Sequence, residues 1–140
     1  MNKILSVLVF SLGISFANAQ TIKETEVPFA IKAAFAKMYP GIKQATWDKE
    51  NNLYEASFTD GSYKGSVLFD ANGKWTERET AIPVSQLPQK VRAYMQTHYK
   101  KEKLLGAAKI KKSSGEVEYE AEIKGKDIFF TKDGEFIKEG

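Results

Sequence analysis

Apolar residues recur along this chain at two different periods, and the first is helical. One stripe at i, i+3, i+4 and i+7 consists of Ile31, Ala34, Phe35 and Met38. This spacing predicts a helix with one apolar side. Pro28 stands near its start, where a missing N–H is tolerated, and Pro40 follows its end. Residues 88–99 show the same spacing, so we expect a second helix there.

After each helix the period changes to two, which predicts short strands. Residues 116–123 alternate without a break, so their apolar members must share one face, and we expect the same of residues 54–58. Turn-forming pairs separate such segments: Asn51-Asn52, Asp60-Gly61, Asn72-Gly73, Ser114-Gly115 and Asp133-Gly134. The predicted order is a helix and then about four antiparallel strands, twice over, which is an α+β fold.

Three blocks of similar sequence indicate an internal duplication. Residues 27–39 match residues 87–99 at an offset of 60. Tyr54-Glu55-Ala56-Ser57-Phe58 matches Tyr119-Glu120-Ala121-Glu122-Ile123, and residues 67–75 match residues 128–136. The order of the blocks is the same in both halves. We therefore expect two repeats, at about 27–80 and 87–140, joined by a connector at 81–85.

We expect both helices to cover one face of the sheet or sheets and to leave the other face open. The predicted inner layer contains Ala45, Trp47, Tyr54, Phe58, Val67, Phe69, Trp75, Ile110, Val117, Tyr119, Ile123, Ile128, Phe130 and Phe136. The predicted open face contains Thr46, Glu55, Ser57, Lys64, Ser66, Leu68, Lys74, Lys109, Lys111, Glu118, Glu120, Glu122 and Phe129.

The N-terminus has the pattern of a secretory signal peptide. A basic start at residues 1–3 precedes an apolar run at 4–16, and Ala17 and Ala19 are the small residues of a cleavage site. This predicts a signal peptide over residues 1–19, cleaved between Ala19 and Gln20. The run is shorter than the roughly 20 residues that span a bilayer. We therefore expect residues 20–140 in the periplasm or outside the cell, with no membrane span.

Composition narrows the possible chemistry. The 140 residues include no Cys and one His, which excludes disulfides, thiolate nucleophiles and His-rich metal sites. A net charge of +3 does not indicate a nucleic-acid binder. There is no Gly-rich phosphate loop, HExxH or GxSxG motif. The sequence therefore predicts no catalytic residue, no metal site and no cofactor.

Four alternating glutamates are the most prominent charged feature: Glu116, Glu118, Glu120 and Glu122. They are open to three interpretations: a cation site, a carboxylate pair for hydrolysis, or cross-strand pairing with Lys109 and Lys111. The pairing explains both charge runs at once, and we favour it. His98 ends a helical stripe and is interpreted as a packing residue or a favourable C-terminal charge. Asp70-Ala71-Asn72-Gly73 is interpreted as a hairpin turn rather than a calcium loop.

The motifs Tyr-Glu-Ala-x-hydrophobic at 54–58 and 119–123, and hydrophobic-x-Phe-Asp-x-Asn-Gly-Lys-Trp at 67–75, come after a signal peptide and a helix. In this order they resemble the PepSY-like family, also described as β-lactamase-inhibitor-like, over nearly all of residues 27–140. The resemblance implies tandem α+β units with an exposed, often concave, sheet surface. In the namesake inhibitors such a surface binds a protein, and PepSY domains in protease propeptides are associated with inhibition. The resemblance carries no catalytic residues.

We therefore expect an exported, non-enzymatic binding module whose partner is a cell-envelope protein or an extracellular hydrolase. The equivalent residues Leu68 and Phe129 are either docking points or cover beneath a loop. The predicted contact residues are Thr46, Ser57, Lys64, Leu68, Lys109, Glu118, Glu120 and Phe129. Two alternatives remain: a carrier of a small ligand or cation that uses the glutamates, and a hydrolase built on a carboxylate pair.

Overall fold

The computed structural model describes residues 19–140, which form two helices and one antiparallel sheet. The first half contains β1 (Gln20–Ile22), α1 (Phe29–Met38), β2 (Thr46–Glu50), β3 (Leu53–Asp60), β4 (Tyr63–Phe69) and β5 (Trp75–Ile82). The second half contains α2 (Gln89–His98), β6 (Gly106–Lys112), β7 (Val117–Ile123), β8 (Lys126–Thr131) and β9 (Phe136–Glu139). The strands follow one another in chain order across the sheet, from β1 to β9.

The predicted signal peptide falls, apart from Ala19, outside the described residues. Neither of the helices found between residues 19 and 140 is long and apolar enough to cross a membrane.

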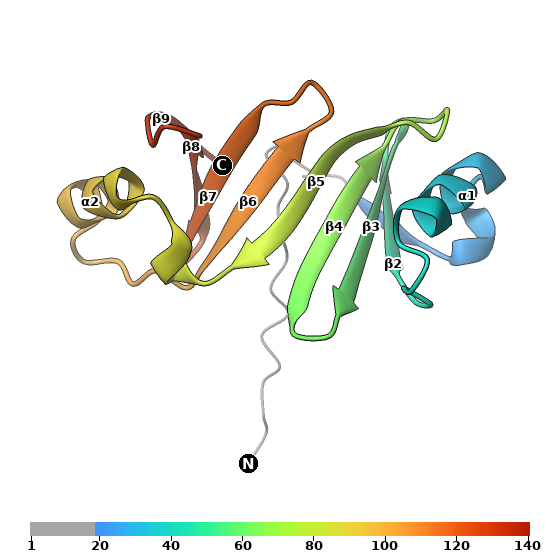
Figure 1. Cartoon of the computed structure of the whole chain (residues 1–140), viewed down its shortest axis with the longest axis horizontal. Coiled ribbons are helices and arrows are strands. Elements are labelled where there is room, and N and C mark those ends of the chain that lie inside the picture. Colours follow the sequence, from blue (N-terminus) through green and yellow to red (C-terminus); the bar gives the residue numbers. More distant parts are fainter. Residues whose placement is uncertain (1–18) are drawn as a thin grey trace, which may run out of the picture.

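The two halves repeat the same unit, which confirms the predicted tandem duplication. In each, a short 3₁₀ turn and a ten-residue helix are followed by four antiparallel strands, β2–β5 in the first half and β6–β9 in the second. The halves meet at β5, which continues to Ile82 and therefore overlaps the expected connector. The end of β5 pairs with β6 through Ile82 and Ala107, as β1 pairs with β2 through Ile22 and Trp47. The strand β5 thus closes the first unit and opens the second, and the helices lie at opposite ends of the sheet (Figure 1).

Both helices pack on the same face of the sheet, which we call the helix face. Arg78 pairs with Val67 beneath α1, and Ile82 pairs with Ala107 beneath α2. Because Arg78 and Ile82 are four residues apart on β5, their side chains point to the same side. The face that points away from α1 and α2 is called the far face. The buried strand residues of the helix face are Trp47, Tyr54, Ala56, Phe58, Val67, Phe69, Ala107, Ala121, Ile123, Ile128 and Phe130.

The predicted apolar stripes hold the helices in place. Ile31 and Phe35 of α1 are buried, and the Phe35 ring lies 5.5 Å from those of both Trp47 and Phe58. Val91 and Met95 of α2 are buried in the equivalent way. Every first-half residue predicted for the inner layer packs in this cluster. Aromatic contact area of this kind is a large stabilising contribution in a chain without disulfides.

One strand of the predicted inner layer has the opposite orientation. The register of β6 pairs Lys109 with Tyr119 on the helix face, and Ile110 with Glu118 on the far face. The expectation that Ile110 lies beneath the second helix is therefore wrong. The expected pairing of Lys109 and Lys111 with the glutamates is wrong for the same reason. A single apolar residue between two lysines does not decide which side of a strand faces inward, and a shift of one residue reverses every side chain.

Two hairpin turns dock against the first turns of the helices at equivalent positions. Gly73 has φ of +85°, and a Cβ atom there would lie 2.9 Å from the carbonyl oxygen of Ala30 in α1. Gly134 has φ of +87°, and its Cβ would lie 2.9 Å from the Cβ of Lys90 in α2. The repeat therefore preserves both the turn and the close approach that requires glycine.

We predict that Gly73→Ala destabilises the fold by about 2–5 kcal/mol. A left-handed residue with a side chain costs about 1–2 kcal/mol, and overpacking against Ala30 adds about 1–3 kcal/mol. Gly115 has φ of +93° but nothing within 4 Å of its added Cβ, so Gly115→Ala is the matched control and bears only the first cost. Urea unfolding of both variants measures the difference. Equal losses would show that the contact with α1 contributes nothing.

Candidate functional site

The candidate site is the far face, where one row of side chains crosses the sheet. Register pairs Thr46 with Ser57, Ser57 with Ser66, Ser66 with Glu79, and Glu79 with Ile110. Neighbouring rows of the same face add further residues to the candidate site. These are Glu55, Leu68, Glu77, Ala81, Ala108, Glu118, Glu120, Glu122 and Phe129. Strands from both repeats therefore build one continuous surface.

The apolar residues of the far face are more deeply buried than the sequence indicates. Leu68 and Phe129 lie on this face, as predicted, but are 0% and 1% exposed. The Phe129 ring is covered in part by Lys138, whose Nζ lies 5.2 Å from the ring centroid, and by the terminal Gly140. Leu68 lies between Glu55 and Glu77 on the adjacent strands. Both residues are therefore packed beneath their neighbours rather than presented as isolated docking points.

Three buried glutamates from three strands make the centre of the far face unusual. Glu79 on β5 is 1% exposed, Glu120 on β7 is 4% exposed and Glu55 on β3 is 5% exposed. Both carboxyl oxygens of Glu79, Oε1 of Glu55 and Oε2 of Glu120 lack a hydrogen-bond partner. Burying such groups without partners costs about 1–3 kcal/mol each, more if they are charged.

Burial and mutual repulsion favour the protonated forms of these glutamates. Desolvation raises the pKa of Glu55 to about 7, with the Ser66 hydroxyl opposing the shift and Asp48 adding to it. Desolvation, with repulsion from Glu79 and Asp127, raises the pKa of Glu120 to about 10. The pKa of Glu79 is raised well above its usual range by desolvation and by Glu55. At neutral pH the centre of the far face therefore carries less negative charge than its composition indicates.

Charge is segregated between the two faces of the sheet. On the far face, Lys112 Nζ lies 2.6 Å from Oε1 of Glu118, and none of the ion pairs found within residues 19–140 involves Glu55, Glu79 or Glu120. On the helix face, Arg78 is directly opposite Lys111. Like charges in direct cross-strand positions are unfavourable. The sheet therefore has an acidic side and a basic side.

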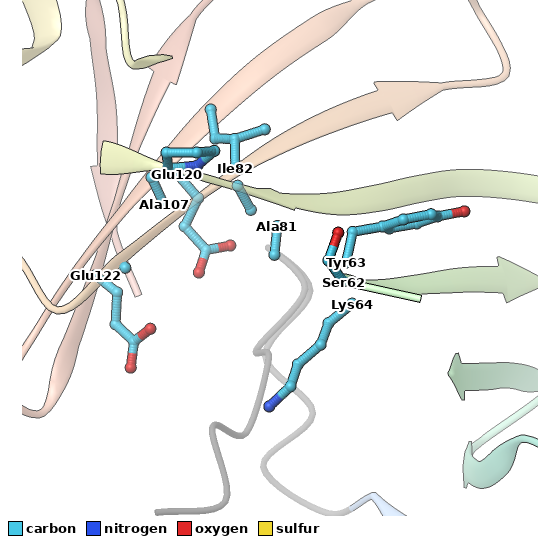
Figure 2. A pocket seen from close by; sticks show the side chains of 11 residues that line it. Ser62, Tyr63, Lys64, Ala81, Ile82, Ala107, Glu120 and Glu122 are labelled. Carbon is cyan, nitrogen blue, oxygen red and sulfur yellow. The ribbon is translucent and has the colours of Figure 1, made fainter. Parts of the chain in front are cut away.

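A pocket of about 440 Å³ opens on the far face where the two repeats meet. Its walls come from the start of β4, the end of β5, the start of β6 and the middle of β7. Glu120, Glu122 and Lys64 extend their charged ends into the space beside Ala81 and the β6 backbone (Figure 2). A pocket of this volume is in the range of small-molecule sites.

The structure brings together most of the contact residues predicted from the sequence. The members found on the far face are Thr46, Ser57, Lys64, Leu68, Glu118, Glu120 and Phe129. Lys109 is exposed on the helix face. Glu79 was missed, although the alternation Glu77-Arg78-Glu79 in a strand was a signal that both glutamates share a side.

The described residues hold no group of three or more acidic or His side chains arranged to bind a metal ion. The central glutamates are distributed over separate strands. His98 is exposed at the end of α2, where its ring stacks on that of Tyr94 with centroids 4.1 Å apart. Asp70 Oδ1 accepts hydrogen bonds from the N–H groups of Asn72 and Lys74, which confirms a hairpin turn.

Comparison with known families gives one match. The family described as "Putative beta-lactamase-inhibitor-like, PepSY-like" matches residues 52–138, which is more than half of the chain. A comparison with curated proteins gives no match at all.

Several solved structures share the fold. A "DUF2874 family protein" from Bacteroides uniformis has a TM-score of 0.71 at 21% identity, covering 81% of this chain and 88% of that one. A "putative periplasmic" protein from Bacteroides eggerthii has a TM-score of 0.69 at 18% identity, with the same two coverages. A "BLIP-like protein" from Bacteroides fragilis has a TM-score of 0.61 at 24% identity, covering 79% and 83%. At these identities the likeness shows the fold.

We predict that the protein is more stable at pH 5 than at pH 8. The folded-state pKa of Glu55 is raised from 4.5 to about 7, so the folded protein binds more protons than the unfolded chain between these values. The contribution of Glu55 to stability is therefore fully present below pH 4.5 and is lost as the pH rises through 7, by about 2–3 kcal/mol between pH 5 and pH 8. Glu120 extends the loss towards pH 10.

Denaturant unfolding across pH 4.5–9 measures this slope. Glu55→Gln should remove the pH dependence of the free energy of unfolding between pH 4.5 and 7. Glu102→Gln, at an exposed loop position, should leave that pH dependence unchanged. A free energy of unfolding that rises from pH 5 to pH 8 in the unmodified protein would contradict the prediction.

Proposed function

The chain belongs to the family of PepSY-like, β-lactamase-inhibitor-like proteins, and on that premise we propose that it is an exported binding protein that docks a partner protein on its far face. The segregation of charge between the two faces is the observation that carries this proposal. A surface that gathers glutamates on one side of a sheet recognises partners of complementary charge.

The far face has the composition of a recognition surface. Its buried carboxyl groups lie beside apolar Leu68 and Phe129, and exposed Thr46 and Lys64 lie nearer its margin. Protein interfaces commonly combine a desolvated centre with a polar rim. A basic side chain from a partner would offset the repulsion among these carboxyl groups and stabilise their ionised forms, so the centre favours a partner that presents basic side chains.

Export of the chain rests on two supports. The N-terminal residues have the pattern of a signal peptide, and a structural neighbour is described as "putative periplasmic". We place the protein in the periplasm or outside the cell, where the partner is an envelope protein or an extracellular hydrolase. The inhibitor-like description of the family supports a role through binding rather than catalysis.

A second candidate function is the binding of a small ligand, and the pocket where the repeats meet favours it. The two functions differ in what they require. Protein docking uses the broad far face, whereas ligand binding depends on the pocket alone.

We predict that arginines on the far face abolish partner capture. Thr46 and Ser57 are cross-strand neighbours, so Thr46→Arg/Ser57→Arg adds bulk and positive charge at one place. Immobilised protein is exposed to an envelope extract, the captured partner is identified and purified, and its Kd is measured for each variant. We expect at least a ~10-fold weaker Kd for the double variant, because a misplaced charge must be desolvated.

Thr80→Arg is the matched control, since Thr80 is as exposed as Thr46 but lies on the helix face. Asp substitutions at Leu68 or Phe129 are unsuitable, because both residues are buried and the fold would be lost. If the partner is a hydrolase, its inhibition is assayed with the same variants. Unchanged affinity in the double variant, or a loss in Thr80→Arg alone, would place the interface elsewhere.

A further inference from the structure

The two repeats differ at one equivalent position on the far face. Glu55 and Glu120 are counterparts in the Tyr-Glu-Ala motif, and both are buried. In the first repeat, the row that continues from Glu55 contains Asp48 and then Thr21. In the second repeat, the row that continues from Glu120 contains Ala108 and then Ala81.

The rows beside the two glutamates therefore differ in size and polarity. In the first repeat the Thr21 hydroxyl donates a hydrogen bond of 2.6 Å to Asp48 Oδ1, and the pair lies in the row beside Glu55. In the second repeat only the methyl groups of Ala81 and Ala108 lie in the row beside Glu120, and these three residues line the pocket of about 440 Å³.

The pocket combines apolar walls with a carboxyl group that needs a partner. Ala81 and Ala108 contribute aliphatic surface, and Glu120 and Glu122 contribute carboxyl groups. Glu120 is 4% exposed, its Oε2 has no hydrogen-bond partner, and its side chain points into the pocket (Figure 2). A donor that enters the pocket can therefore pair with a carboxyl group that is already desolvated.

The carboxyl groups in and around the pocket favour a cation. Glu79, Asp127 and Glu122 lie close enough to Glu120 to disfavour its ionised form, and a cation bound beside Glu120 would offset that repulsion and stabilise the carboxylate. Lys64 is the cation of the lining; it is exposed, and within residues 19–140 no ion pair joins it to Glu120 or Glu122. A hydrated, exposed ammonium screens a buried carboxylate poorly.

We infer that this pocket receives a basic side chain, of lysine or arginine type, presented by the partner protein. Such a side chain has an aliphatic stem that suits the alanine walls and a cationic end that donates to Glu120 and Glu122. That the side chain comes from a partner protein rests on the proposed function. That the pocket binds a basic group does not depend on where the group comes from.

The test titrates the purified protein with N-acetyl-lysine methylamide and follows the backbone amides of residues 106–108 by NMR. We expect binding by this probe and none by its Nε-acetylated analogue. Glu120→Gln should weaken the affinity for the probe by roughly 10- to 100-fold, which is the range expected for the loss of a charge-assisted hydrogen bond. Glu55→Gln is the matched control, because the equivalent glutamate of the first repeat is buried but does not line this pocket.

A second variant closes the pocket without changing its charge. Ala81→Thr/Ala108→Asn reproduces the shape of the Thr21–Asp48 pair of the first repeat, an arrangement that this fold already accommodates. We expect it to fold and to lose the probe. Retained binding in this variant, or in Glu120→Gln, would overturn the inference. Equal binding of the acetylated analogue would also overturn the inference, as would NMR shifts of the same amides with Ca²⁺ or Mg²⁺ but not with the probe.

The captured partner distinguishes this inference from the proposed function. If Ala81→Thr/Ala108→Asn and Thr46→Arg/Ser57→Arg each lose affinity for the partner, the result supports the docking face and also the pocket as a partner contact. Loss in Thr46→Arg/Ser57→Arg alone keeps the docking face and overturns the pocket as a partner contact. If cadaverine binds the pocket and no protein requires it, the cation is a free amine, which overturns the protein source and favours the small-ligand function.

Discussion

Backbone pairing through β5 is the constraint on which this structure depends. Each repeat has one short helix, which covers only the helix face of its own strands. A unit of that size buries little surface by itself. Because β5 pairs with β4 on one side and β6 on the other, the two units share one sheet and their cores support each other without a disulfide.

The same continuity explains why the far face acts as one surface. Glu55, Glu79 and Glu120 come from the first repeat, the shared strand and the second repeat. Their mutual repulsion exists only because the sheet brings these strands together. Arg78 of β5 and Lys109 and Lys111 of β6 point to the other side, so the alternation of the strands separates most of the charges of this protein.

Duplication also supplies an internal comparison. The two Tyr-Glu-Ala motifs place equivalent glutamates in equivalent rows, yet the row of Glu55 continues into Asp48 and Thr21 and the row of Glu120 into Ala108 and Ala81. The small residues of the second row line the pocket where the repeats meet. A fold built from two copies can keep one for stability and adapt the other for recognition.

The sequence by itself determined the elements, the duplication and most of the core, because helical and alternating periods directly report which side of an element is apolar. It also identified Glu118, Glu120, Leu68 and Phe129 as members of one face. Only the tertiary structure decided the orientation of β6, since a short strand with one isoleucine between lysines fits either side until its neighbours fix the register. It also decided that Glu79 joins Glu55 and Glu120, because burial and repulsion depend on strands that are distant in the chain and adjacent in the sheet.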